Sequence, residues 1–252
     1  LKKGDVLSEA YLDELPRQQW FKLRMQDEAY NELLAQADNF SVAGSQRFGE
    51  LVAKRLPTYE ALFKDVARQF GLDWHLLAAV AYQESHWNPK ARSPTGVRGL
   101  MMLTLNTARE MAIKNRLDPL QSLTGGAAYL SKLRARLPQQ INEPDRTLFA
   151  LAAYNVGFGH LEDARILTQR NGQDPNLWEH VRQQLPKLSN KQYYLTLKYG
   201  FARGSEPVIY VDNIQYYRRY LELHELAQQN ELPSEGDAPS QNEWQDATPP
   251  SL

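Results

Sequence analysis

The chain has 252 residues, of which 42% are hydrophobic, and this is enough to bury one sizeable core. Its 29 basic and 30 acidic residues leave a net charge of −1, so no global field attracts nucleic acid or an anionic membrane surface. The lack of cysteine excludes disulfides, thiolate metal sites and cysteine nucleophiles. No apolar stretch has the length that crosses a bilayer, and a start at Leu1 without a charged, apolar leader predicts a mature product or an excised fragment.

Composition divides the chain into three parts. Residues 1–56 are expected to form an N-terminal helical extension, with short helices at 9–15 and 18–37 and a polar linker at 39–45. Residues 57–228 hold the dense periodicity of a main domain. Residues 229–252 contain four prolines and five acids but no Lys or Arg, and this composition predicts a disordered tail.

The main domain shows repeated helical periodicity and no alternating strand pattern, so we expect a mainly α fold. Pro57 opens the first helix and Gly71 ends it, while Asp73 can cap the next helix, which runs to Glu84. From residue 88 to 103 a run of turn signals predicts a loop or small hairpin. Further helices are expected at about 104–114, 119–137, 144–154, 159–168, 176–185, 190–199 and 208–227.

Glu84 is the most informative residue because it continues the apolar face of its helix. This face runs through Leu77, Val80, Ala81 and Glu84, at positions i, i+3, i+4 and i+7. Pro89 is expected to stop the helix soon afterwards. Lost hydration and the negative end of the helix dipole both disfavour a charged carboxylate here, so the group can keep a proton near neutral pH and donate it. An ion pair with a buried arginine, or a side chain turned to solvent, explains the periodicity equally well.

A glycosidic bond is usually cleaved by two carboxylates, one acting as acid and the other as nucleophile or base. No second acid lies close to Glu84 in the sequence. Asp163, Glu206 and Asp212 can approach it in space, but each fits equally well on a solvated helix face or in a turn. If Glu84 works alone, the substrate must supply the nucleophile, as sugars with a 2-acetamido group do. A polymer of muramic acid and glucosamine is then a natural candidate.

Three segments of the main domain carry ordered motifs. Residues 83–104 contain Gln-Glu-Ser-His-Trp-Asn-Pro and end in Gly-Leu-Met-Met-Leu-Thr, residues 152–159 contain Ala-Tyr-Asn-Val-Gly, and residues 210–214 read Tyr-Val-Asp-Asn-Ile. Together they resemble the soluble-type lytic transglycosylases, lysozyme-like enzymes that cleave bacterial peptidoglycan, over roughly residues 57–225. Most members have Gln where this chain has Met102.

The Met at position 102 indicates which subgroup of the family the chain resembles. The Met-Met-Leu-Thr version, with Ala-Arg-Gly-Ser-Glu at 202–206, resembles the membrane-bound members, in which a solute-binding-like module precedes the catalytic domain. Residues 1–56 are too short to be that module.

The resemblance implies a mainly α, lysozyme-like fold with a small hairpin after the catalytic helix. Glu84 would protonate the glycosidic oxygen and then, as a carboxylate, deprotonate the muramoyl 6-hydroxyl, which closes a 1,6-anhydro ring without water. Ser93 would bond the acetamido or lactyl region of the sugar, and Asn155 would position the sugar or Glu84. The residues that would line the site are Tyr154, Tyr210, Gly99, Leu100, Met101 and Met102.

Each of these residues also has a purely structural reading. Ser93 can cap the turn before a proline, Asn155 can end a helix ahead of a glycine, the tyrosines can be core residues and the glycines can serve turns alone. The five histidines show no paired metal spacing, so we expect no metal and no cofactor. A basic helix edge that is expected to face solvent consists of Lys132, Arg134 and Arg136.

The resemblance therefore predicts non-hydrolytic cleavage of the β-1,4 bond between MurNAc and GlcNAc. Two alternatives stay open: a hydrolytic muramidase of the goose-lysozyme type, in which Asp212 activates water, and an inactive peptidoglycan-binding module. The implied partners are peptidoglycan glycan strands, with muropeptides as candidate regulators, and not nucleic acid. The implied location is the periplasm at the inner face of the outer membrane, with attachment through segments outside this chain.

Overall fold

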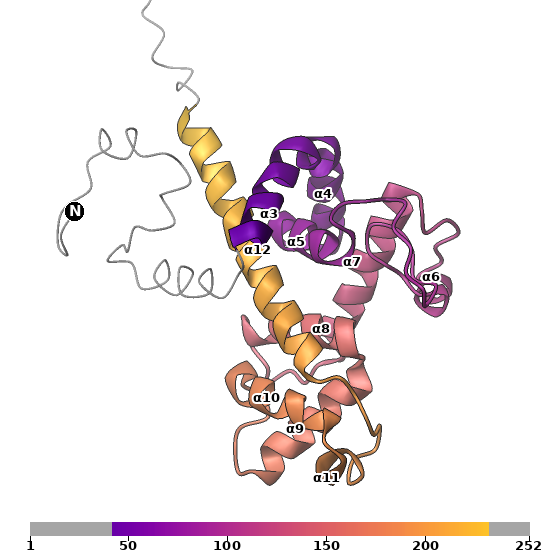
Figure 1. Ribbon diagram of the computed structural model, residues 1–252, viewed down its shortest axis with the longest axis vertical. Coiled ribbons are helices and arrows are strands. Elements are labelled where there is room, and N and C mark those ends of the chain that lie inside the picture. The colour runs from indigo at the N-terminus through magenta and orange to yellow at the C-terminus, as the bar shows by residue number, and fades with distance from the viewer. Residues whose placement is uncertain (1–41, 232–252) are drawn as a thin grey trace, which may run out of the picture.

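The computed structural model describes residues 42–231, so the expectations for 1–41 and 232–252 lie outside the described residues. Every regular element in the described range is a helix. Helices α3 to α5 form one end of the molecule, α9 to α11 form the other, and the long α12 connects the two ends (Figure 1). The bounds are α3 Val42–Lys54, α4 Leu56–Phe70, α5 Trp74–Ser85, α6 Leu105–Glu110, α7 Pro119–Arg136, α8 Asp145–Val156, α9 Phe158–Arg170, α10 Trp178–Gln184, η2 Leu185–Ser189, α11 Lys191–Tyr194 and α12 Ser205–Glu231.

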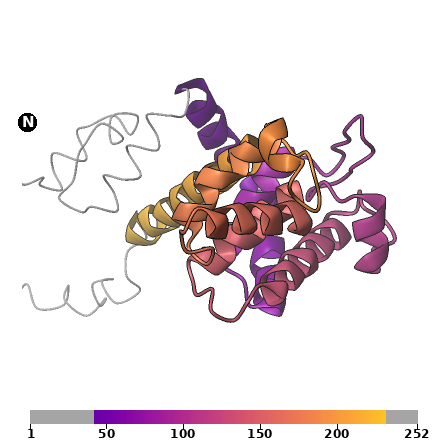
Figure 2. The same ribbon diagram turned by 90° about the horizontal axis from the view of Figure 1, so that it is seen from below.

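Helix α5 is the central element because other helices enclose it. Its residues from Leu76 to Tyr82 are all buried, and it packs against α4 on one side and α12 on another. The view from below shows α12 lying across the other helices (Figure 2). A helix that is apolar on most of its surface belongs in a core. Its central position therefore fixes where the side chains of its last turn lie within the domain.

The observed start of α5 agrees with the prediction from the sequence, whereas the residue that ends it is not the predicted proline. Asp73 caps the helix as predicted, since its carboxylate accepts a 2.9 Å hydrogen bond from the backbone N–H of His75. The helix ends at Ser85, before Pro89 is reached, because His86 and Trp87 adopt positive φ angles of 51° and 55°. The fully buried indole of Trp87 folds back and donates its Nε1–H to the Ala78 carbonyl at 2.9 Å. This packing, and not proline, stops the helix.

The predicted linker at 39–45 is wrong in its second half, because α3 already begins at Val42. The fully buried ring of Phe48 in α3 packs against Tyr82, Trp87 and Tyr217 with centroid distances of 4.4, 5.8 and 4.6 Å. Such aromatic packing stabilises a core well beyond its buried area. A division of the chain at residue 57 stays a prediction, and the packing of Phe48 argues for an earlier start of the main domain.

The later helices confirm the predicted order but differ in length. Helix α6 stops at Glu110 because the chain turns back, and Gln121 accepts hydrogen bonds from the N–H groups of Lys114 and Asn115. Helix α11 keeps only four residues, since the chain beyond it is drawn towards the carboxylate of Asp163. Helix α12 is longer than predicted and extends to Glu231, inside the expected tail.

Between residues 42 and 231, no helix combines the length and the apolar character that a membrane span requires.

Candidate active site

Glu84 lies in the last turn of α5, where α12 crosses it. Its Oε1 accepts a hydrogen bond of 2.6 Å from the hydroxyl of Tyr210, a buried residue of α12 that is 126 positions away in the sequence. Because the extensive contact between α5 and α12 aligns these two residues, the packing of the helices fixes the orientation of the carboxyl group.

The surroundings of Glu84 favour its protonated form. Burial raises the pKa of this carboxyl from an ordinary value of 4.5 to about 7, and the hydrogen bond from Tyr210 opposes part of that rise. Among residues 42–231, no Lys, Arg or His approaches the Glu84 carboxylate within ion-pair distance. The alternative of a glutamate paired with a buried arginine is therefore wrong. The site provides a carboxyl group that is half protonated near neutral pH.

Two tyrosines lie near this acid, of which Tyr210 is buried and Tyr154 is partly buried. Tyr154, near the end of α8, donates its hydroxyl to the Met101 carbonyl at 3.0 Å. Burial and the nearby charge of Glu84 raise the pKa of both Tyr154 and Tyr210 well above 10. Both phenols therefore stay protonated and act as hydrogen-bond donors at neutral pH.

Residues 88–103 form the predicted small hairpin directly after α5, with single bridges that pair Arg92 with Arg98 and Arg98 with Leu103. The hairpin requires glycine at position 99, where φ is +86° and an added Cβ would lie 1.7 Å from the Arg116 carbonyl oxygen. The chain can therefore pass this close to residue 116 only without a side chain.

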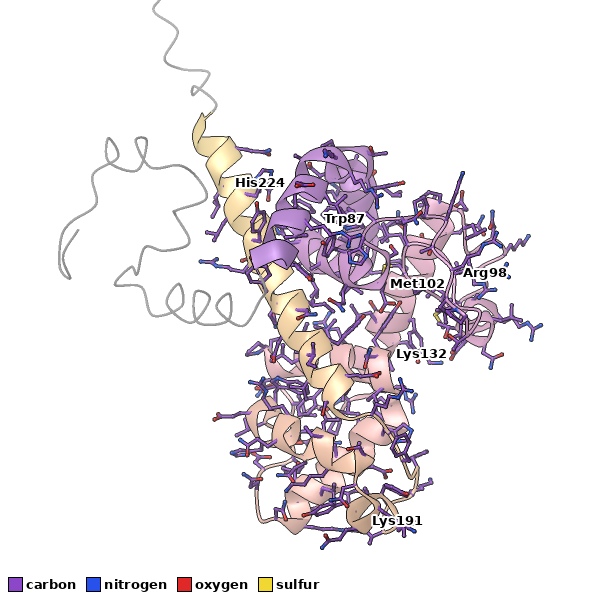
Figure 3. The ribbon with its side chains drawn as sticks, viewed as in Figure 1. Trp87, Arg98, Met102, Lys132, Lys191 and His224 are labelled. Carbon is purple, nitrogen blue, oxygen red and sulfur yellow. The ribbon has the colours of Figure 1, made fainter. Side chains whose placement is uncertain are left out.

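Leu100 and Met101 lie at the base of the hairpin and are fully buried. Their side chains are therefore core residues, and Tyr154 already occupies the Met101 carbonyl. Met102 is partly exposed and has a φ angle of 43°, which is uncommon for a residue other than glycine. In the view of Figure 3 it lies between Trp87 at the end of α5 and Arg98 in the outer part of the hairpin.

Ser93 and Asn155 differ in whether their side chains form hydrogen bonds within the protein. The Ser93 hydroxyl shares a 2.8 Å hydrogen bond with Thr95 and accepts a longer one from the N–H of Val97, as expected of a turn-capping serine. Asn155 is exposed on the last turn of α8, and its side chain bonds to no other described residue. Gly157, with a φ of 91°, ends that helix in its place. The Asn155 amide is thus available to a ligand.

The three other acids considered from the sequence already have structural partners. Asp163 is fully buried and accepts from the backbone N–H groups of Lys198 and Tyr199. Glu206 pairs with Arg203 at 3.3 Å. Asp212 pairs with Arg182 at 2.8 Å, although burial still raises the pKa of the Asp212 carboxyl against the effect of that arginine.

The basic helix edge of α7 faces solvent as expected at Lys132 and Arg136, whereas Arg134 is partly buried. Lys132 pairs with Glu110, and Arg134 pairs with Glu143 at 2.5 Å. The guanidinium of Arg136 stacks 3.9 Å from the ring centroid of Phe158. Neighbouring groups therefore already bind these three cations.

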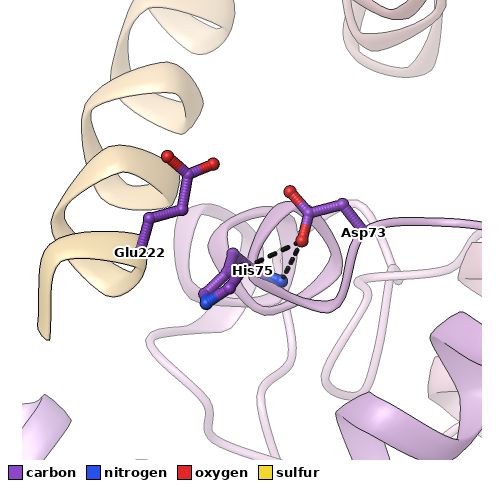
Figure 4. A group of neighbouring side chains, drawn as sticks. All are labelled: Asp73, His75 and Glu222. Carbon is purple, nitrogen blue, oxygen red and sulfur yellow. Dashed lines mark hydrogen bonds and ion pairs between the residues drawn. The ribbon is translucent and has the colours of Figure 1, made fainter. Parts of the chain in front are cut away.

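A group of possible metal ligands lies at the other end of α5 (Figure 4). Atoms of Asp73, His75 and Glu222 come within 4.8 Å of one another. The guanidinium of Arg218, however, donates to Asp73 at 2.7 Å and pairs with Glu222 at 3.0 Å, and His75 also faces Glu225 at 2.9 Å. A guanidinium already supplies the positive charge that these carboxylates need, so the cluster joins α5 to α12 and does not suit a cation.

Sequence reasoning missed the residues that hold the hairpin in place. The buried Ser85 donates to the Leu100 carbonyl at 2.9 Å, and the buried Ser122 of α7 accepts from the Met101 N–H at 3.2 Å. A Cβ at Gly126 would lie 2.5 Å from Met101, so α7 and the hairpin meet there without an intervening side chain. The Gly-Gly pair inside the α7 pattern was the available signal of such a close approach.

Comparison with known proteins gives a consistent result. A family profile described as Transglycosylase SLT domain matches residues 61–176. The chain is 57% identical over 180 residues to membrane-bound lytic murein transglycosylase F of Stutzerimonas stutzeri, and 51% identical over 207 residues to the protein of the same name from Marinobacter nauticus. These matches cover 71% and 82% of this chain but only 37% and 41% of the relatives, so the chain spans about two fifths of their length.

Among solved structures, an inactive mutant of the lytic transglycosylase Slt from Pseudomonas aeruginosa is similar, with a TM-score of 0.52 and 23% identity. The match covers 82% of this chain and 32% of that one, and it confirms the lysozyme-like helical fold. The profile match includes the two motifs around Glu84 and Tyr154. The chain belongs to the family of soluble-type lytic transglycosylases.

Proposed function

We propose that this chain cleaves the β-1,4 bond between MurNAc and GlcNAc in peptidoglycan without water and leaves 1,6-anhydro-MurNAc ends. The protonated Glu84 donates to the glycosidic oxygen as the bond to the anomeric carbon breaks. The 2-acetamido carbonyl of the substrate stabilises that carbon by attack. The Glu84 carboxylate then takes the proton of the 6-hydroxyl, whose oxygen closes the anhydro ring and displaces the acetamido oxygen.

The observation that carries this proposal is the raised pKa of Glu84, a carboxyl group that forms no ion pair within residues 42–231 and is held by the Tyr210 hydroxyl. Glu84 has a pKa of about 7, which suits a group that must first give and then take a proton near neutral pH. Mass spectrometry of muropeptides released from purified sacculi tests the proposal, because an anhydro end is one water lighter than a reducing end. Products with reducing ends alone would instead assign a hydrolytic muramidase, and the absence of products would assign a binding module.

Asn155 and Ser93 are proposed to bind the sugar beside Glu84, because Asn155 offers a free amide and Ser93 lies on the hairpin that follows the catalytic helix. Gly99, Leu100 and Met101 are proposed to act through the fixed backbone of the hairpin, since the two side chains are buried. Met102, with its partly exposed side chain, is proposed to offer an apolar contact to the sugar.

Replacing Asp212 with Asn is expected to leave cleavage within about threefold of the original rate. Asp212 is paired with Arg182, so it is poorly suited to activate water, and the lost exposed pair is worth at most about 1 kcal/mol of stability. Initial rates of muropeptide release measure the effect. A loss of a hundredfold or more, with the fold intact, would favour the goose-type muramidase in which this acid is the base.

Replacing Tyr210 with Phe is expected to move the alkaline limb of the pH–rate profile to higher pH. The hydroxyl of Tyr210 bonds to Glu84 and lowers its pKa, so its removal leaves the acid protonated over a wider range. The rate on sacculi is measured from pH 5 to 9 for both proteins. A limb that stays in place, or moves to lower pH, would show that this bond does not set the titration of Glu84.

The partners and location are proposed from the substrate and from the relatives. Glycan strands of peptidoglycan are the proposed partner, with muropeptides as regulators, and this places the chain in the periplasm. The relatives are described as membrane-bound, which supports attachment to a membrane, and we propose the inner face of the outer membrane as its site. Fractionation of cells that carry the full-length protein tests the location.

A further inference from the structure

The loop of residues 195–204, between α11 and α12, exposes two aromatic rings. Tyr199 is 50% exposed and Phe201 is 57% exposed, and Leu195 beside them is 67% exposed. Large apolar side chains gathered on one surface loop commonly mark a place where a ligand or partner binds. We call this segment the aromatic loop.

The protein holds the aromatic loop rigidly, although the side chains of the loop face solvent. The fully buried carboxylate of Asp163 accepts from the N–H groups of Lys198 and Tyr199 at 3.3 and 2.9 Å. Arg170 donates to the side chain of Thr196 at 2.9 Å. Burying a carboxylate costs free energy because the group loses its hydration, and the two backbone hydrogen bonds offset part of that cost. These bonds therefore hold the loop backbone in one position. Rings that are already ordered bind a ligand with little further loss of entropy.

The aromatic loop is linked to the candidate active site by a packing contact with α9 and by the chain that leads into α12. The ring of Tyr199 rests on Gly159, where an added Cβ would come within 2.7 Å of three ring carbons. Gly159 follows the exposed Asn155 by four residues in the same motif. At its other end the loop leads into α12 (Figure 1). Tyr210, five residues after the start of that helix, donates its hydroxyl to Glu84. A ligand that extends from Glu84 past Asn155 therefore runs towards Tyr199.

The charge of this surface fits an anionic sugar polymer. The ammonium group of Lys198 lies 5.3 Å from the ring centroid of Tyr199, and that of Lys187 lies 5.5 Å from the ring centroid of Tyr193. The nearby acids Asp163 and Glu206 are already bonded within the protein. Aromatic faces contact the apolar faces of sugar rings, and cations beside them suit carboxylates.

We propose that the aromatic loop binds a saccharide of the glycan strand beyond the two sugars at the cleaved bond. Tyr199 and Phe201 stack on its ring, and Lys198 faces the carboxylates of its lactyl or peptide substituent. This proposal rests on the proposed function, because it takes peptidoglycan as the ligand. It assigns the loop a role in preferring long strands over short fragments.

The test compares long glycan strands with the shortest fragment that is cleaved. Tyr199→Ala is expected to raise the KM for long strands roughly five- to tenfold and to leave kcat/KM for the short fragment unchanged. Tyr199→Phe keeps the ring and should restore the original KM. Leu226→Ala, which shortens another half-exposed apolar side chain near the far end of α12, should have no effect on either substrate.

Binding is measured in parallel by sedimentation with purified strands, using Glu84→Gln with and without Tyr199→Ala. An equal loss on long and short substrates, or no loss on either, would overturn the proposal. A loss of self-association in place of glycan binding would assign the loop to a second copy and also overturn it. If the unaltered chain releases no anhydro products but binding still depends on Tyr199, the proposed function fails and the aromatic loop stands as a glycan-binding surface.

Discussion

Glu84→Gln should reduce muropeptide release by at least ~10²–10⁴-fold, since it removes the carboxyl group that is proposed to move protons at the bond. The change keeps the size of the side chain, and the amide oxygen can still accept from Tyr210. The packing of α5 against α12 is therefore expected to survive. The rate of release of anhydro-muropeptides from sacculi, followed by mass spectrometry, measures the loss.

A matched control for this variant is Glu50→Gln, the same chemical change on the exposed face of α3. It should cleave at the original rate. Circular dichroism and thermal unfolding must show that Glu84→Gln is folded before its activity is compared. Full activity in a folded Glu84→Gln protein would contradict the role of Glu84 and, with it, the proposed mechanism.

The sequence singled out Glu84 because a charged residue on an apolar helical stripe is rare, and its catalytic role stays a prediction. The cap at Asp73, the glycine at the end of α4 and the turn signals of residues 88–103 are local features, and each predicted its element. Local chemistry of this kind depends on a few neighbouring residues. It can therefore be read from one sequence.

Other features depend on contacts between distant segments and were missed for that reason. The partner of Glu84 is Tyr210, which only the packing of α12 on α5 brings near. Trp87 turns back onto Ala78 and ends α5 early, and Phe48 makes α3 part of the core. Propensities of Val, Gly and Ser predicted a linker at the start of α3, and tertiary packing outweighed them.

The second large effect concerns stability and follows from the same carboxyl group. The folded state raises the pKa of Glu84 from 4.5 to about 7, so the folded protein binds its proton more tightly than the unfolded chain does. The free energy of unfolding contributed by this group is therefore highest below pH 4.5 and declines as the pH rises to about 7. A pKa shift of this size corresponds to roughly 3 kcal/mol in the free energy of unfolding. This is a large fraction of the total stability of a typical domain.

Glu84→Gln has no proton to lose at this position, so it should escape that decline. It should be similar to the original protein at pH 4 and more stable by roughly 2–3 kcal/mol at pH 8. Urea unfolding of both proteins at several pH values measures the difference, in which the titration of all other groups cancels. Glu50→Gln should follow the original protein throughout. A difference between Glu84→Gln and the original that stays constant from pH 4 to 8 would show that Glu84 is not held protonated by burial, and that its acid function needs another source.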